Sequence, residues 1–125
     1  MKHLSTTVLK DCTRISASLD RVVAPTPAGR LRAFVLHPTH DAGRAPLVVL
    51  SHGLMGHAMN QGWLAVRLAE AGYIVASVHH PGTSWINRDP AARRALWERP
   101  RDVSRTISAM LEHPVFATRI DPRRI

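Results

Sequence analysis

The strongest hydrophobic pattern in the chain lies between Pro46 and Gly82. Residues 47–50 form an unbroken apolar run rich in β-branched side chains, which is typical of a strand buried on both faces. Residues 73–78 predict a second buried strand, apolar except for Ser77 and closed by the sequence His79-His80-Pro81-Gly82. Because the stretch between the runs has helical periodicity, the pattern predicts two parallel strands joined by a right-handed crossover helix.

The connection between these strands predicts a tight turn and then a helix. Gly53 and Gly56 permit a tight backbone path, and Asn60 is a suitable helix N-cap. Gly72 lies where a helix would end in a left-handed residue. Apolar residues recur at helical spacing and predict the buried face, which would comprise Trp63, Leu64, Leu68 and Ala71. Function is expected at the carboxyl ends of the two strands, as in other parallel sheets.

An antiparallel hairpin is predicted before this unit. Residues 15–23 alternate imperfectly between apolar and polar, residues 25–29 have the composition of a turn, and residues 31–36 alternate more regularly. Leu31, Ala33 and Val35 would share one face, and the hairpin would lie at the edge of the sheet. Residues 1–14 carry little pattern and are predicted to be irregular, so a single domain would span residues 15–125.

The C-terminal third predicts further helices. Residues 91–97 form a candidate short helix, and residues 101–112 predict an amphipathic helix with Pro100 in its first turn. His113-Pro114 should end this helix. Its apolar stripe would comprise Val103, Ile107, Met110 and Leu111. The last residues, 123–125, resemble the start of another strand.

Composition restricts the function classes. The net charge is +8, and nine arginines fall from Arg88 onward, but acidic residues are interleaved with them. Interleaved signs are typical of a solvated helical face, so we do not expect nucleic-acid binding. A protein that binds nucleic acid or an anionic surface through residues 88–124 stays open as the least favoured of three hypotheses. Cys12 is the only cysteine, which excludes an intramolecular disulfide. There is no signal-peptide pattern or apolar run of ~20 residues, so a cytoplasmic chain without a membrane span is predicted.

Four motifs together carry a resemblance to a known family. They are VVLSHGLMGH, GYIVASVHHPGTS, RPRDVSRTISAML and RIDPRRI. From about Arg21 to Ile125 the chain resembles the α/β-hydrolase fold, in its dienelactone hydrolase-like and platelet-activating-factor acetylhydrolase-like branch. The resemblance implies a three-layer α/β sandwich, with an antiparallel hairpin followed by a parallel βαβ unit. It also implies a serine hydrolase that acts on esters or lactones without a metal or organic cofactor.

The family's nucleophile motif is missing from this chain. In the resembling branch, the terminal motif leads into the nucleophile strand and its G-x-S-x-G elbow. Ser51 stands in V-L-S-H-G and Ser84 in G-T-S-W-I, so neither matches that elbow. We therefore expect the N-terminal part of a hydrolase sheet, truncated before the nucleophile strand. The catalytic nucleophile, acid and base would follow Ile125, and these residues alone would be inactive.

The resemblance also implies an oxyanion-binding loop after the first predicted parallel strand. One backbone donor would be the N–H of Leu54, while Gly53 would let the backbone approach the substrate and His52 and Gly56 would support the loop. A simpler interpretation remains open, in which residues 51–56 are only a glycine-rich turn between a strand and a helix.

The histidines after the two strands are further candidates. His52, His57, His79 and His80 should converge on one edge of the sheet, but their spacing fits no familiar zinc-ligand pattern, so no metal site is predicted. His79 or His80 as a general base remains open. His80 and Trp85 could line a substrate pocket, whereas Trp97 is expected to pack a helix onto the sheet.

A second function class also remains open. Without a nucleophile strand beside it, the strand at residues 47–50 would expose its backbone at a sheet edge. The chain could then be a catalytically inactive interaction module that pairs through this edge, either with itself or with another chain.

Overall fold

A computed structural model of the chain describes residues 17–26, 29–39, 43–81 and 96–125. Three predictions concern residues outside these ranges: the irregular N-terminus, most of the short helix at 91–97, and the role of Trp85. Within them the elements follow in the order β1 (Ala17–Thr26), β2 (Gly29–Pro38), β3 (Leu47–Ser51), α1 (Gly62–Glu70), β4 (Ile74–His79) and α3 (Glu98–Glu112).

The strands form one mixed sheet in the order β1-β2-β4-β3. β1 and β2 are an antiparallel hairpin, and β2 also pairs antiparallel with β4. β3 and β4 are parallel neighbours, with Leu47 opposite Ile74 and Ser51 opposite Val78. The predicted hairpin and the predicted parallel pair are therefore both confirmed, and β1 lies at one edge of the sheet as expected.

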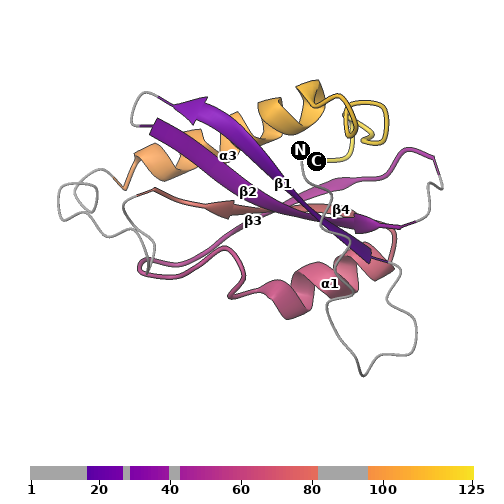
Figure 1. Cartoon of the computed structure of the whole chain (residues 1–125), viewed down its shortest axis with the longest axis horizontal. Helices are drawn as coiled ribbons and strands as arrows, with labels where there is room; N and C mark the ends of the chain where they lie inside the picture. Colours follow the sequence, from indigo (N-terminus) through magenta and orange to yellow (C-terminus); the bar gives the residue numbers. More distant parts are fainter. Residues whose placement is uncertain (1–16, 27–28, 40–42, 82–95) are drawn as a thin grey trace.

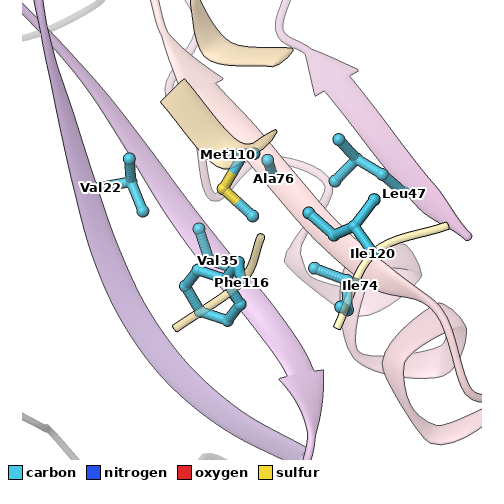
Figure 2. Close-up of a cluster of buried hydrophobic side chains, with 8 residues drawn as sticks. All are labelled: Val22, Val35, Leu47, Ile74, Ala76, Met110, Phe116 and Ile120. Atoms are coloured by element: carbon cyan, nitrogen blue, oxygen red, sulfur yellow. The ribbon is translucent and has the colours of Figure 1, made fainter. Parts of the chain in front are cut away.

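Helices cover both faces of the sheet and give the three layers expected (Figure 1). Between the sheet and α3 lies the cluster of buried side chains in Figure 2, which includes Phe116 and Ile120 from the segment after α3. On the opposite face, Leu36 and Val75 of the sheet pack against α1. The predicted inward face of β2, Leu31, Ala33 and Val35, is buried.

The two parallel strands differ in burial. All residues of β4 from Ile74 to Val78 are buried, as a central strand requires. In β3 only Leu47 is buried, the next three residues are half-buried and Ser51 is exposed. The prediction that both strands are buried on both faces is therefore wrong for β3, because β3 is the last strand of the described sheet.

Helix α1 is rotated relative to its predicted orientation. Its N-cap is Gln61, which makes no capping bond with its side chain. Asn60, the predicted cap, instead accepts a hydrogen bond from the His57 N–H with its side-chain oxygen. The buried face consists of Ala65, Val66 and Ala69, whereas Trp63 is 71% exposed. Small side chains face the sheet, and the largest apolar side chain points away from it.

The C-terminal ends of both helices match their predicted signals, and so does the first turn of α3. Gly72 follows α1 with a φ of 101°, in the left-handed region that glycine adopts without strain. Pro100 lies in the first turn of α3, and His113 adopts an extended conformation before Pro114, which ends the helix.

The buried face of α3 is only partly apolar. It consists of Asp102, Thr106 and Met110, which recur every four residues. Of the predicted apolar stripe only Met110 is buried, and the Thr106 hydroxyl is satisfied by donating to the Asp102 carbonyl at 2.9 Å. The helix therefore presents an apolar end to the core in Figure 2 and a carboxylate at its other end.

Arginines in the described C-terminal region pair with neighbouring acids. Arg105 contacts Asp102 at 3.2 Å, and Arg124 contacts Asp121 at 2.8 Å. This pairing fits the solvated face that the interleaved charges predict. Among the residues that the structure describes, no helix has the length and apolar character needed to cross a bilayer.

Candidate functional site

The carboxyl ends of β3 and β4 bring four histidines together. Because the two strands are parallel neighbours, the residues that follow them lie at the same edge of the sheet. Ring centroids are 5.0 Å apart for His52 and His80 and 4.8 Å apart for His57 and His79. The predicted convergence is confirmed. Within the described ranges, no group of three or more His, Cys, Asp or Glu side chains is arranged to hold a metal ion.

A tight turn connects β3 to the segment before α1. The Gly56 N–H donates to the Gly53 carbonyl at 2.9 Å, and Met55 has a φ of 63°, which is rare for a residue with a side chain. A Cβ added at Gly56 would lie 2.9 Å from both the Gly53 oxygen and the Asn60 side-chain oxygen. Gly56 is therefore required by close approach of the backbone, whereas a Cβ at Gly53 would meet nothing within 4 Å.

His52 links this turn to the end of β4. Its ring is buried, and Nε2 accepts a hydrogen bond from the His80 backbone N–H at 3.1 Å. Since Nε2 is an acceptor, Nδ1 carries the proton and donates to the Gly53 carbonyl at 2.7 Å. The His52 carbonyl accepts from the Arg99 guanidinium at the start of α3. The loop backbone is therefore held by hydrogen bonds that connect it to the end of β4, to its own Gly53 carbonyl and to the start of α3.

His80 is fully buried, and both of its ring nitrogens are bonded. Nε2 lies 2.7 Å from the Ser51 hydroxyl oxygen, and Nδ1 lies 3.0 Å from a carboxylate oxygen of Asp102. A pocket wall must be open to ligand, whereas the His80 side chain has no exposed surface among the described residues, so its predicted place in a substrate pocket stays a prediction. A general base needs the same access to substrate, so His80 is not offered as one.

Sequence reasoning missed Asp102 and Arg99. Both belong to the RPRD stretch at the start of α3, which contributes to a family motif and to a predicted helix but to none of the predicted site residues. The signal that could have found them is the spacing of Asp102, Thr106 and Met110, because a carboxylate on a buried helix stripe requires a buried partner.

Leu54 occupies the centre of the turn and is 50% exposed. In the described part of the chain its backbone N–H has no hydrogen-bond acceptor. The neighbouring carbonyls of His52 and Gly53 are both bonded. The loop thus combines fixed acceptors with an N–H that remains free to bind an incoming group.

The structure supports neither of the roles predicted for the two tryptophans Trp85 and Trp97. Trp85 lies outside the described residues, so its pocket role stays a prediction. Trp97 is the N-cap of α3 and is 66% exposed. The prediction that Trp97 packs a helix onto the sheet is therefore wrong.

Burial keeps two of the clustered histidines neutral. Desolvation lowers the pKa of His52 below its usual value, and the hydrogen bond to Gly53 only partly opposes that effect. Desolvation, aided by the nearby His57 and His52, lowers the pKa of His79 to about 4. Around neutral pH the edge of the sheet is therefore lined by uncharged imidazoles of these two residues.

A comparison of the sequence with known families identifies the family of this chain. Residues 12–95 match the profile of the family described as platelet-activating factor acetylhydrolase, isoform II. The chain belongs to that family. The match to platelet-activating factor acetylhydrolase, isoform II, covers every described strand together with the loop at residues 52–56. A comparison with curated proteins returns no match.

Solved structures share the fold. A bacterial heroin esterase is 24% identical with a TM-score of 0.64, over 93% of this chain and 36% of its own. A ferulic acid esterase from Streptomyces cinnamoneus is 18% identical with a TM-score of 0.70, over 91% of this chain and 52% of its own. A dienelactone hydrolase-like promiscuous phosphotriesterase from metagenomic libraries is 18% identical with a TM-score of 0.61, over 85% of this chain and 46% of its own.

The described part of the acetylhydrolase-family chain has the architecture of the N-terminal part of an α/β-hydrolase. The chain spans between about a third and about half the length of these three structures. The predicted fold and family are therefore confirmed.

The turn generates a prediction about its two glycines. Gly56→Ala should lower the free energy of unfolding by about 1–3 kcal/mol, because the new Cβ overlaps two oxygen atoms. Gly53→Ala, the matched control, should change it by less than about 0.5 kcal/mol. Urea denaturation followed by circular dichroism measures both, and equal effects of the two substitutions would contradict this geometry.

The low pKa of His79 predicts a pH dependence of stability. The pKa is about 4 in the folded chain and 6.5 in the reference state, so the unfolded chain binds more protons between these values. The contribution of His79 is therefore complete above about pH 6.5 and is lost as the pH falls toward 4. Urea denaturation should show that wild type loses more stability than His79→Gln between pH 7 and about 4.5. An equal loss in both proteins would refute the prediction.

Proposed function

We propose that the hydrolase domain to which this chain contributes cleaves small esters or lactones with a serine nucleophile. Family membership and esterase-like structural neighbours support the reaction class. The nucleophile is placed outside these residues, because no G-x-S-x-G elbow occurs among them. The contribution of this chain would be the loop at the carboxyl end of β3.

Ester hydrolysis passes through a tetrahedral intermediate whose oxygen carries negative charge. N–H groups held in place before the reaction stabilise that oxygen without reorganisation. The observation that carries the proposal is the Leu54 N–H, which has no acceptor in the described chain although the neighbouring carbonyls are bonded. Leu54 would be one oxyanion donor, and the open space beside Gly53 would admit the substrate carbonyl.

Two loop residues would position the Leu54 N–H. His52 would fix the backbone through its bonds to Gly53 and His80. Gly56 would close the turn where a side chain cannot fit. No cofactor enters this mechanism, because the charge of the intermediate is met by backbone N–H groups and the attacking group is a side chain.

The donor role of Leu54 predicts a selective loss of turnover. In a preparation of the whole hydrolase domain, Leu54→Pro removes the N–H and should lower kcat about 10²–10³-fold on a p-nitrophenyl ester. Leu54→Ala keeps the N–H and should stay near wild type. Replacing the Leu54 amide with a backbone ester, which also removes the N–H, repeats the test if proline disturbs the turn. Unchanged kcat in both variants that lack the N–H would sink the proposal.

These 125 residues alone should show no saturable ester hydrolysis. The donor would be present, but the attacking serine would not. Hydrolysis with saturation kinetics that disappear in Ser51→Ala would instead identify Ser51 as a nucleophile and overturn the placement of the serine.

The edge of β3 supports a second candidate function, a module that pairs through its sheet. β4 lies on one side of β3. On the other side, within the described residues, only the Leu47 N–H is bonded, by the Arg124 carbonyl at 3.0 Å. Unpaired strand edges of this kind recruit further strands.

Pairing predicts protection that depends on concentration. As the protein concentration rises, amide hydrogen exchange of Val49 and Ser51, whose N–H groups face the open edge with that of Leu47, should slow because a second strand would bind them. The edge strand β1, at the other side of the sheet, serves as the internal control and should not change. Sedimentation velocity showing a monomer at every concentration would exclude self-pairing.

A further inference from the structure

Three elements meet in one chain of side-chain hydrogen bonds. Ser51 is the last residue of β3, His80 follows β4, and Asp102 lies in the first half of α3. The Ser51 oxygen is 2.7 Å from His80 Nε2, and His80 Nδ1 is 3.0 Å from Asp102 Oδ2. A carboxylate can only accept, so Nδ1 carries a proton, and in the neutral ring Nε2 then accepts from the Ser51 hydroxyl.

This connectivity is that of a serine–histidine–aspartate triad, but its position argues against nucleophilic catalysis by Ser51. The histidine of a triad must pass its proton to the leaving group and therefore touch the substrate. The His80 side chain has no exposed surface, and the His52 ring packs edge-on against it with centroids 5.0 Å apart. The hydrogen bonds therefore connect β3, the residue after β4 and α3 to one another, and they do not deliver a proton to a substrate.

The same histidine holds the loop. The His80 backbone N–H donates to His52 Nε2 at 3.1 Å, and His52 Nδ1 donates to the Gly53 carbonyl at 2.7 Å. Because the His80 ring and this backbone N–H belong to one residue, bonds that fix the ring at both nitrogens also restrain where the N–H lies. The path from Asp102 to the loop is a continuous series of hydrogen bonds through His80 and His52.

We propose that Ser51, His80 and Asp102 are positioning residues that hold the 52–54 loop with its Leu54 N–H available as a donor. This inference rests on the proposed function for the meaning of the loop, but it concerns the order of the loop and can be tested without any ester. Asp102 fixes the His80 tautomer by accepting from Nδ1, and the Ser51 hydroxyl bonds the other ring nitrogen. His52 connects His80 to the turn through its bonds to the His80 N–H and the Gly53 carbonyl.

Asp102→Asn gives a spectroscopic signature. Asp102 Oδ1 also accepts from Arg105 Nη1 at 3.2 Å, and arginine can only donate. In the Asp102→Asn variant, the amide oxygen must face Arg105, so the amide NH₂ group faces His80 Nδ1 and the ring must carry its proton on Nε2. The tautomer of His80 should therefore invert, which a packing role alone would not require.

The experiment uses the 125-residue chain labelled with ¹⁵N and read by NMR. In wild type, the His80 ring nitrogens should report the Nδ1–H tautomer, and the Leu54 amide should have an order parameter near ~0.85. Asp102→Asn should invert the tautomer, and both Asp102→Asn and Ser51→Ala should lower the Leu54 order parameter below ~0.6. Ser51→Thr keeps the hydroxyl and should restore the wild-type value.

Two control variants make the same chemical changes, loss of a serine hydroxyl and loss of a carboxylate, at positions away from the loop. Ser104→Ala removes an exposed serine hydroxyl from α3, and Asp121→Asn removes a carboxylate that pairs with Arg124 away from the loop. Both should leave the Leu54 order parameter at the wild-type value. Ser51 is exposed at the end of its strand, so Ser51→Ala decides the matter even if Asp102→Asn does not fold.

Two results would overturn the positioning role. One is a Leu54 order parameter that stays at the wild-type value in Ser51→Ala and in folded Asp102→Asn. The other is covalent labelling of Ser51 by a fluorophosphonate probe, which would make Ser51 a nucleophile. Failure of the oxyanion proposal looks different, because Leu54→Pro would then leave turnover intact while these NMR results stood.

Discussion

The fold at its functional edge depends on one buried imidazole. His80 has no exposed surface, and it is bonded at both ring nitrogens and at its backbone N–H. A polar ring in the core is costly unless its partners are present, and each partner here belongs to a different element. The bonds to Ser51, Asp102 and His52 therefore specify how the ends of β3 and β4 meet the start of α3.

The loop after β3 inherits its shape from this arrangement. His52 and Arg99 engage two consecutive carbonyls, Gly56 closes the turn, and the Leu54 N–H is left without an acceptor in the described chain. Fixed donors matter for ester chemistry because they need not reorganise as charge develops. The proposed function follows from this geometry, since the Leu54 N–H would supply one donor of an oxyanion site.

Much of the fold could be predicted from local pattern. The segment at residues 74–78, apolar except for Ser77, and the alternation through Leu31, Ala33 and Val35 encode burial directly. Gly72 and Pro114 mark helix ends by backbone geometry alone. The orientation of α1 could not be predicted this way. Periodicity weighs Trp63 as strongly as any apolar residue, whereas the sheet admits the small side chains of Ala65 and Ala69.

The site was harder to predict because its key contacts are distant in the sequence. Loop residues next to a strand could be singled out by motif, but nothing local shows that Asp102 is buried. Its partner His80 lies 22 residues earlier, and a charged residue near a helix start is ordinarily solvated. The burial of His80 could not be predicted for the same reason, because it depends on contacts with α3 and with His52.

The most direct test of the central claim is a structure of the whole hydrolase domain inhibited by a phosphonate ester. The phosphonyl oxygen stands in for the oxyanion of the tetrahedral intermediate. This account predicts that the oxygen lies about 2.7–3.1 Å from the Leu54 nitrogen, with His80 still bonded to Ser51 and Asp102. An oxygen held by other donors, with the Leu54 N–H turned away from it, would contradict the account.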